Sequence, residues 1–177
     1  MLKQGLIQIY TGYGKGKTTA ALGQALRALG SGLKVCIFQF LKDEKVGSGE
    51  LISAEKFKEA LKIVRGKQTH PCFSKGKDNL SLCENIKSMF NQVLKIMKSR
   101  KYDLIILDEI NNCISDGFIE VNKVIEMFKE KPKNVELILT GRNAPYEIIE
   151  KADLVTEMAL IKHPFSNGIK ARGGIEY

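Results

Sequence analysis

The sequence predicts a three-layer α/β domain with a mainly parallel sheet, and three observations support this prediction. Short apolar runs alternate with helical patterns along the chain, a glycine-rich turn containing Gly-Lys-Thr follows the first run, and two adjacent acidic residues follow a later one. Strands that alternate with helices form parallel sheets covered on both faces. The 177 residues, 44% of them hydrophobic, suffice for one core, so we expect residues 1–177 to form a single domain.

The first half of the chain predicts three strands and two helices. After the glycine-rich turn, alanine and leucine recur at helical spacing from Ala21 to Leu29, and Gly30-Ser31-Gly32 ends this helix. The following apolar run is typical of a strand that is buried on both faces. The elements expected here are strands over residues 6–10, 35–40 and 62–64, a helix from the turn to residue 30, and a short helix over residues 53–60.

The second half begins with residues 66–80, which show no periodicity and predict a long irregular connection. Ser81 and Glu84 then form a capping box that opens a helix. Pro132 stops the next helix, while Asn143 is expected to cap the last one, with Pro145 at its first position. The expected elements are strands over residues 104–107, 135–140 and 154–158 and helices over residues 81–97, 119–131 and 145–152.

The glycine-rich turn predicts a site for the triphosphate of a nucleotide. Consecutive backbone N–H groups of such a turn point at one place, and the positive end of the following helix dipole adds to them. Lys17 is expected to reach the outer phosphates and Thr18 to hold Mg²⁺. Thr11 stands where the usual pattern has its first glycine. The predicted nucleotide-binding residues are Thr11, Gly12, Tyr13, Gly14, Lys15, Gly16, Lys17, Thr18 and Thr19.

Asp108 and Glu109 end the fully apolar run over residues 104–107. A P-loop enzyme needs carboxylates at such a strand end to position Mg²⁺ beside the loop hydroxyl, here that of Thr18. Ligands of parallel sheets gather at the carboxyl ends of the strands. Residues 39–42 and 140–142 fall on the same edge and are therefore further candidates.

Composition narrows the classes of partner. The formal charge of +8 favours anionic ligands, but no aromatic residues interleave with the lysines of the middle segment, so we expect no nucleic-acid partner. No run approaches 18 apolar residues and no signal-peptide core precedes the first strand, so we expect a cytoplasmic protein without a membrane span. The motifs alone leave open a small-molecule kinase, another P-loop NTPase and a RecA-like nucleic-acid-binding ATPase.

A wider set of motifs resembles the P-loop, RecA-like family of corrinoid adenosyltransferases. Thr11 matches this family where ordinary P-loops carry glycine. The resemblance covers nearly the whole chain. The similar stretches are residues 10–12, 14–22, 39–42, 49–50, 103–111, 140–142, 152–158, 162–165 and 174–177.

The resemblance implies a homodimeric enzyme that uses Mg²⁺ and ATP to attach a 5′-deoxyadenosyl group to the cobalt of a corrinoid. In that family Co(I) attacks the ribose C5′ and expels triphosphate, the nucleotide being held in the reverse of the usual direction. It implies an electron donor, such as a flavoprotein-type reductase, as partner. Co(I) carries its own nucleophilic electron pair, so no general base is required.

The resemblance also implies roles for individual residues. Lys17 and Thr18 become the catalytic residues that stabilise the departing triphosphate, and Thr18, Glu109 and Asp108 the Mg²⁺ site. Arg142 and Lys42 match positions that contact phosphate or corrinoid. The implied corrinoid contacts are Phe40, Lys42, Phe73 and Asn111. Two departures affect these expectations: Tyr13 replaces a small polar residue, and the chain has no tryptophan where the family often has Phe-Thr-Trp, near Phe73.

Overall fold

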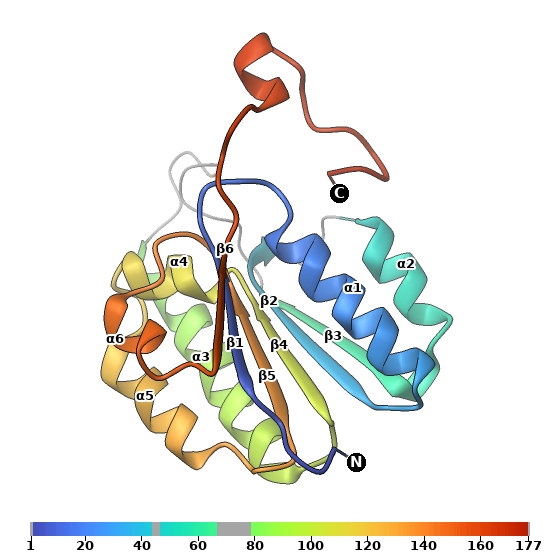
Figure 1. The fold of residues 1–177 in the computed structure, drawn as a ribbon, viewed down its shortest axis with the longest axis vertical. Helices are drawn as coiled ribbons and strands as arrows, with labels where there is room; N and C mark the ends of the chain where they lie inside the picture. Colours follow the sequence, from blue (N-terminus) through green and yellow to red (C-terminus); the bar gives the residue numbers. More distant parts are fainter. Residues whose placement is uncertain (1, 44–46, 67–78, 177) are drawn as a thin grey trace.

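The computed structural model describes residues 2–43, 47–66 and 79–176 and contains a six-stranded sheet (Figure 1). Every strand pair is parallel, and the strand order is β3-β2-β4-β5-β1-β6. The carboxyl ends of all strands therefore lie along one edge. The strands are β1 (Ile7–Thr11), β2 (Val35–Asp43), β3 (Leu61–Gly66), β4 (Leu104–Asp108), β5 (Glu136–Thr140) and β6 (Leu154–Glu157).

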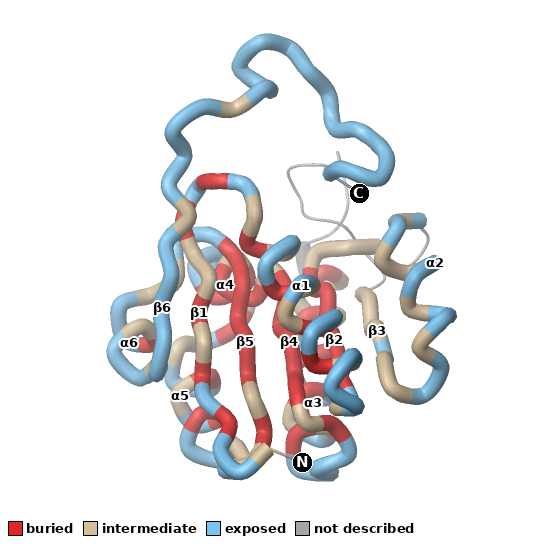
Figure 2. Tube along the Cα trace, turned by 45° about the vertical axis from the view of Figure 1, so that its right-hand side comes forward, coloured by how far each residue is buried: buried red, intermediate tan, exposed pale blue. Residues whose placement is uncertain are grey.

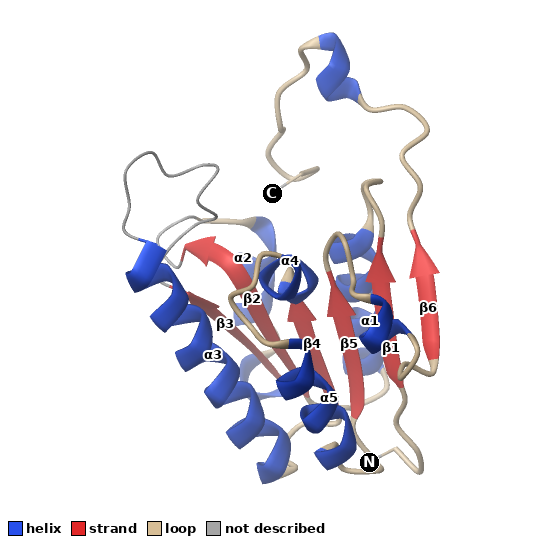
Figure 3. Ribbon diagram, turned by 90° about the vertical axis from the view of Figure 1, so that its left-hand side faces the viewer, coloured by secondary structure: helices blue, strands red, loops and turns tan. Residues whose placement is uncertain are grey.

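Helices cover both faces of the sheet, which completes the three layers and confirms the predicted fold class (Figure 3). One face carries α1 (Lys17–Gly30), with α2 (Gly49–Glu55) beside it. The other face carries α3 (Asn79–Ser99), α4 (Ile110–Ser115), α5 (Val121–Glu130) and α6 (Tyr146–Ile149). Two 3₁₀ turns, Lys58–Ala60 and Pro164–Asn167, complete the regular structure of the described residues. None of the described helices has the length and apolar character to cross a membrane.

The central strands are buried on both faces, as their unbroken apolar runs predict (Figure 2). In β2, Phe38 and Phe40 point into the larger core under α3 to α6, whereas Ile37 points toward α1. On that second face the buried hydrophobic residues of α1 are the alanines Ala21, Ala25 and Ala28, so the helix packs closely against the sheet. This close packing fixes the start of α1, and with it the glycine-rich turn.

Four local details differ from the expectations. The short helix begins at Gly49 instead of residue 53, and the long helix begins at Asn79, so Ser81 lies inside it and does not cap it. Asn143 adopts a left-handed conformation (φ 52°) and Pro145 is the N-cap of α6. Helix α4 was not predicted, because Ile110–Ser115 has weak helix propensity. Burial of its apolar residues in the core compensates for this.

The chain beyond β6 leaves the sheet and passes above its carboxyl edge (Figure 1). It then returns, so that the C-terminal end lies over the side of the sheet that carries α1. An ion pair of 2.8 Å joins Glu176 to Lys15 of the glycine-rich turn. The C-terminal end thus contacts the glycine-rich turn at the edge where the candidate site lies.

Candidate functional site

The glycine-rich turn between β1 and α1 has a backbone that requires glycine. Gly12 and Gly16 have φ values of 95° and 124°, a region that side chains disfavour. A Cβ at Gly12 would lie 2.5 Å from the carbonyl oxygen of Met158, and one at Gly14 would lie 2.6 Å from that of Ala159. The Gly14 N–H donates to Met158 O at 2.7 Å. The segment that follows β6 therefore packs directly against the turn and leaves no room for side chains there.

Lys17 lies inside this turn and is 8% exposed. Its Nζ donates to the carbonyl oxygens of Gly12 and Gly14, at 2.6 and 2.7 Å. Burial lowers the pKa of the ammonium, and the positive charge of Arg142 lowers it further, while the carboxylate of Glu109 opposes both effects. The turn thus holds a cation at its centre, within reach of an anion seated on the backbone N–H groups.

Asp108 lies behind the turn, 1% exposed, and each of its carboxylate oxygens has polar partners. Thr18 and Thr140 donate their hydroxyls to Oδ1, at 2.8 and 2.7 Å. Oδ2 accepts from Gln39 Nε2 at 3.3 Å and lies 3.4 Å from the ammonium of Lys42. This carboxylate fixes the orientation of the Thr18 hydroxyl, which the sequence predicts as a metal ligand.

Glu109 is the next residue, but its carboxylate lacks the hydrogen-bond donors that surround Asp108. Its backbone is left-handed (φ 65°), and its N–H donates to the hydroxyl of Thr140 at 3.0 Å. Among the described residues, no group donates a hydrogen bond to its carboxylate. Burial and the charge of Asp108 raise its pKa. The nearby cations that oppose this increase are Lys17, Lys42 and Arg142. A half-buried carboxylate beside a second carboxylate, with no donor of its own, is chemically suited to a divalent cation.

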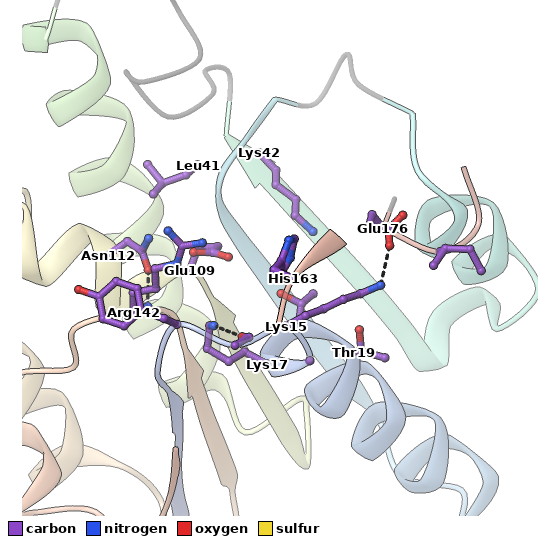
Figure 4. A pocket seen from close by; sticks show the side chains of 15 residues that line it. Lys15, Lys17, Thr19, Leu41, Lys42, Glu109, Asn112, Arg142, His163 and Glu176 are labelled. Atoms are coloured by element: carbon purple, nitrogen blue, oxygen red, sulfur yellow. Dashed lines mark hydrogen bonds and ion pairs between the residues drawn. The ribbon is translucent and has the colours of Figure 1, made fainter. Parts of the chain in front are cut away.

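These side chains surround one cavity of about 550 Å³ (Figure 4). Arg142, Asn112 and Leu41 lie at one end, and Lys15, Thr19 and Glu176 at the other. The cavity is lined by residues 13–19 of the turn and by Leu41, Lys42, Glu109, Asn112, Arg142, His163, Ile175 and Glu176. The enclosure is of the size of a ligand pocket, with a cationic wall suited to a polyphosphate.

A bulge in β2 brings two residues to the cavity. The pairing of β2 with β3 shifts between Gln39 and Asp43, and Leu41 adopts a positive φ of 59°. Both Leu41 and Lys42 line the cavity as a result. Lys42 also borders a second, larger groove of about 960 Å³ between α1, α2 and β3. That groove shares Thr18, Thr19 and Glu109 with the cavity, and its apolar walls include Leu22, Leu26, Leu29, Phe57, Leu61 and Ile63.

The structure brings most of the predicted residues together. Residues 13–19, Lys42, Glu109 and Arg142 line the cavity, and Asp108 supports it from behind. Thr11 and Gly12 lie beneath the turn, where the hydroxyl of Thr11 accepts from Ala144 N at 3.3 Å.

The predicted corrinoid contacts are not all brought to the cavity. Phe40 and Asn111 are fully buried and do not line it, so we do not retain them as contacts. Phe40 points into the larger core, and Asn111 Nδ2 donates to Gly141 O at 3.4 Å. Phe73 lies outside the described residues.

The sequence assigns no individual role to four of the lining residues, Leu41, Asn112, Ile175 and Glu176, although Leu41 lies in the stretch 39–42 that is expected at this edge. No local signal marks Leu41, whose position depends on the bulge. His163 also lines the cavity, but its Nδ1 accepts from Phe165 N at 3.1 Å and caps the Pro164–Asn167 turn. That bond gives the histidine a structural role.

Residues 3–177 match the protein family described as ATP:corrinoid adenosyltransferase BtuR/CobO/CobP. The corrinoid adenosyltransferase of a Sinorhizobium species is 36% identical over 99% of this chain and 81% of its own length. The Pseudomonas aeruginosa corrinoid adenosyltransferase is 32% identical, over 99% of this chain and 85% of its own. The corrinoid adenosyltransferase of Escherichia coli K12 is 31% identical, over 99% of this chain and 87% of its own length.

Two solved structures share the fold at low sequence identity. The flagellar accessory protein FlaH from Methanocaldococcus jannaschii superposes with a TM-score of 0.61 and 16% identity, over 88% of this chain and 72% of its own. The KaiC-like protein PH0186 from Pyrococcus horikoshii OT3 superposes with a TM-score of 0.59 and 19% identity, over 91% of this chain and 76% of its own. At these identities the similarity concerns the fold alone.

Proposed function

Because this chain belongs to the BtuR/CobO/CobP family of ATP:corrinoid adenosyltransferases, we propose that it transfers the 5′-deoxyadenosyl group of ATP to the Co(I) centre of a corrinoid. The reaction releases triphosphate and belongs to adenosylcobalamin biosynthesis or salvage. The observation that carries this proposal is the cavity built on the glycine-rich turn, in which Lys17, Lys42 and Arg142 surround the space beside Glu109.

The proposed transfer is a nucleophilic displacement. The electron pair of Co(I) attacks the ribose C5′, a cobalt–carbon bond forms, and the C5′–O bond breaks with its electron pair remaining on the triphosphate. No proton has to be removed from the nucleophile. The protein contributes by positioning the two substrates and by stabilising the negative charge of the leaving group. Lys17 and the backbone N–H groups of residues 14–19 do this through charge and hydrogen bonds.

Thr18 and Glu109 are the proposed ligands of Mg²⁺, and Asp108 orients the Thr18 hydroxyl. The observation that favours this division is the difference between the two carboxylates. Asp108 is engaged by four partners, whereas the carboxylate of Glu109 lines the cavity with no donor from the described residues. When bound, Mg²⁺ supplies positive charge that stabilises the triphosphate.

Lys42 and Arg142 are the proposed further contacts of the substrates. Arg142 lies at one end of the cavity, and Lys42 lies where the cavity meets the larger groove between α1 and α2. We propose that Lys42 faces the junction of the nucleotide and the corrinoid.

The proposed assembly is a cytoplasmic homodimer, and an electron donor of the flavoprotein-reductase type reduces the cobalt of its corrinoid substrate to Co(I). The edge strand β6 supports a second copy, because in the described part of the chain it pairs only with β1. Leu154 and Val155 on this strand are 42% and 39% exposed. Unpaired edges with exposed apolar residues are typical of surfaces that pair with another chain.

The product of the reaction tests the proposal. The protein is incubated without oxygen with MgATP and a chemically reduced corrinoid, and both products are analysed. We expect triphosphate and a light-sensitive alkyl-corrinoid in equal amounts. ADP with unchanged corrinoid would instead identify a kinase or another NTPase.

Two variants connect the reaction to the cavity. Lys17→Ala is expected to lose at least 100-fold in activity, because it removes a charge from the leaving-group site. Lys129→Ala, an exposed lysine on α5, is the matched control. Glu109→Gln is expected to weaken the dependence of ATP binding on Mg²⁺, measured by calorimetry with and without EDTA. Full activity of Lys17→Ala would contradict the assignment of the turn.

A further inference from the structure

Tyr13 is a large aromatic residue at the tip of the glycine-rich turn, where it lines the cavity and is 56% exposed. Two contacts fix it. Its hydroxyl donates to Asn143 Oδ1 at 2.8 Å. The guanidinium carbon of Arg142 lies 5.7 Å from the centre of its ring, within the range of a cation–π interaction. The ring therefore forms a support against which Arg142 rests.

The backbone on either side of Arg142 is also fixed. The N–H of Arg142 donates to Asn112 Oδ1 at 2.7 Å. Gly141 has a φ of 131°, and a Cβ there would lie 2.5 Å from the same Asn112 oxygen. Asn143, on the other side, is left-handed with a φ of 52° and accepts the tyrosine hydroxyl. With the main chain held, the ring of Tyr13 is the group that sets the direction of the arginine side chain.

The way in which Arg142 is held leaves its hydrogen-bond donors available. Within the described residues, no carboxylate forms an ion pair with Arg142. The guanidinium of Arg65 shows the contrast, because it donates to Gln39, Ser48 and Glu50. An aromatic face attracts a guanidinium without occupying its in-plane N–H groups, which remain able to bind phosphate oxygens in pairs.

The charge of Arg142 acts inside the cavity. It lowers the pKa of Lys17, after the larger effect of burial, and it opposes the increase that burial causes in the pKa of Glu109. The guanidinium thus acts on the same space as the lysine of the turn. Figure 4 shows Arg142 at one end of the cavity and Lys17 below it.

We propose that Tyr13 is a positioning residue that holds the Arg142 guanidinium in place to bind the phosphate chain of the nucleotide. The proposal rests on the proposed function only in taking a nucleoside triphosphate as the ligand. Because the side chain is oriented before binding, less conformational freedom is lost when the nucleotide binds.

A double-mutant cycle on the full-length protein tests the coupling between the two residues. Dissociation constants for MgATP are measured by calorimetry for the wild type, Tyr13→Leu, Arg142→Gln and the double variant. We expect Tyr13→Leu to weaken binding about two- to fivefold, the range of a cation–π contact at an exposed site. In the Arg142→Gln background we expect Tyr13→Leu to change the constant by less than about 1.5-fold, because the two residues act as one unit.

Two further variants separate positioning from a general structural effect. Tyr13→Phe keeps the ring and is expected to bind MgATP within about twofold of the wild type. Tyr146→Leu removes a tyrosine that is 70% exposed on α6 and is expected to leave binding unchanged. An equal effect of Tyr13→Leu with and without Arg142 would overturn the proposal, as would wild-type binding by Tyr13→Leu. The binding of MgATP is measured without corrinoid. The test of Tyr13 therefore remains valid even if the protein does not catalyse the proposed transfer reaction.

Discussion

Glu50 should stabilise the fold through its charge. It lies at the start of α2, with a side chain that is 15% exposed, and its Oε1 accepts from Gln39, Lys42 and Arg65 at 3.1, 3.2 and 3.1 Å. The Arg65 side chain beside it is only 4% exposed. Lys42 contacts both Glu50 and Asp108, so the carboxylate helps to hold a cation at the cavity.

The magnitude follows from the pKa of this carboxyl. Burial raises the pKa of Glu50, but the hydrogen bonds from Gln39 and from its own backbone N–H, and the charge of Lys42, together lower it to about 2. A decrease from 4.5 to about 2 corresponds to about 3 kcal/mol, at 1.36 kcal/mol for each pH unit. Water in the adjoining groove screens part of this energy, so we expect Glu50→Gln to lower the free energy of unfolding by about 2 kcal/mol at pH 7.

The sign of the pH dependence follows from the direction of the change. A carboxyl whose pKa is lower in the folded state stabilises the fold above its unfolded pKa, near 4.5, and loses this contribution as the pH falls toward 2. The difference between wild type and Glu50→Gln should therefore shrink below about pH 5. Urea unfolding followed by circular dichroism, from pH 7 to 3.5, measures it.

The exposed ion pair of Glu120 with Lys123 provides the control for this experiment. The two side chains are 71% and 53% exposed, so water screens the pair and Glu120→Gln should leave the free energy of unfolding close to that of the wild type. Equal destabilisation by both variants would refute the argument. A deficit of Glu50→Gln that stayed constant down to pH 3.5 would refute it too, because the charge could not then be its cause.

Three further predictions concern packing around the site. Gly141→Ala should destabilise by about 2–3 kcal/mol in urea unfolding, whereas Gly117→Ala, with a positive φ in open space, should cost about 1 kcal/mol; equal costs would exclude the steric cause. Thr140→Val removes the buried hydrogen bond of 2.7 Å from the threonine hydroxyl to Asp108. It should lower the free energy of unfolding by about 1–3 kcal/mol in the same measurement, and an unchanged stability would contradict this role. Burial raises the pKa of Cys36 to about 12, so iodoacetamide at pH 8 should modify the half-buried Cys83 and spare Cys36, as read by peptide mass spectrometry; rapid labelling of Cys36 would contradict its burial.

The predicted residues that the structure brings to one cavity are mostly neighbours in the sequence. The order strand, glycine-rich turn, helix is continuous in the chain, and it places residues 13–18 in one cavity. Asp108 and Glu109 are placed at the same edge because they stand at the carboxyl end of β4. Their positions in the sequence do not show that Asp108 has hydrogen-bond partners and that no described residue donates to the carboxylate of Glu109. The partners of Asp108, namely Thr140, Gln39 and Lys42, come from other strands.

The parts that sequence reasoning missed depend on tertiary geometry. The family resemblance implies Phe40 as a corrinoid contact, but the two-residue period of β2 points its side chain into the same core as Phe38. The bulge at Leu41 interrupts that period and brings Leu41 and Lys42 to the cavity. A left-handed leucine has no signature in the sequence. It persists because pairing on both sides of β2 holds the strand in place.

The conformation of the glycine-rich turn, which follows β1, also depends on the segment that follows β6. Gly12 and Gly14 are required by the carbonyl groups of Met158 and Ala159, which lie against the turn. The Sδ atom of Met158 would lie 3.1 Å from a Cβ at Gly16. Since β6 pairs with β1 immediately before the turn, a displacement of β6 would alter the path of the turn as well as the sheet edge. The geometry of the glycine-rich turn thus depends on residues about 140 positions away in the sequence.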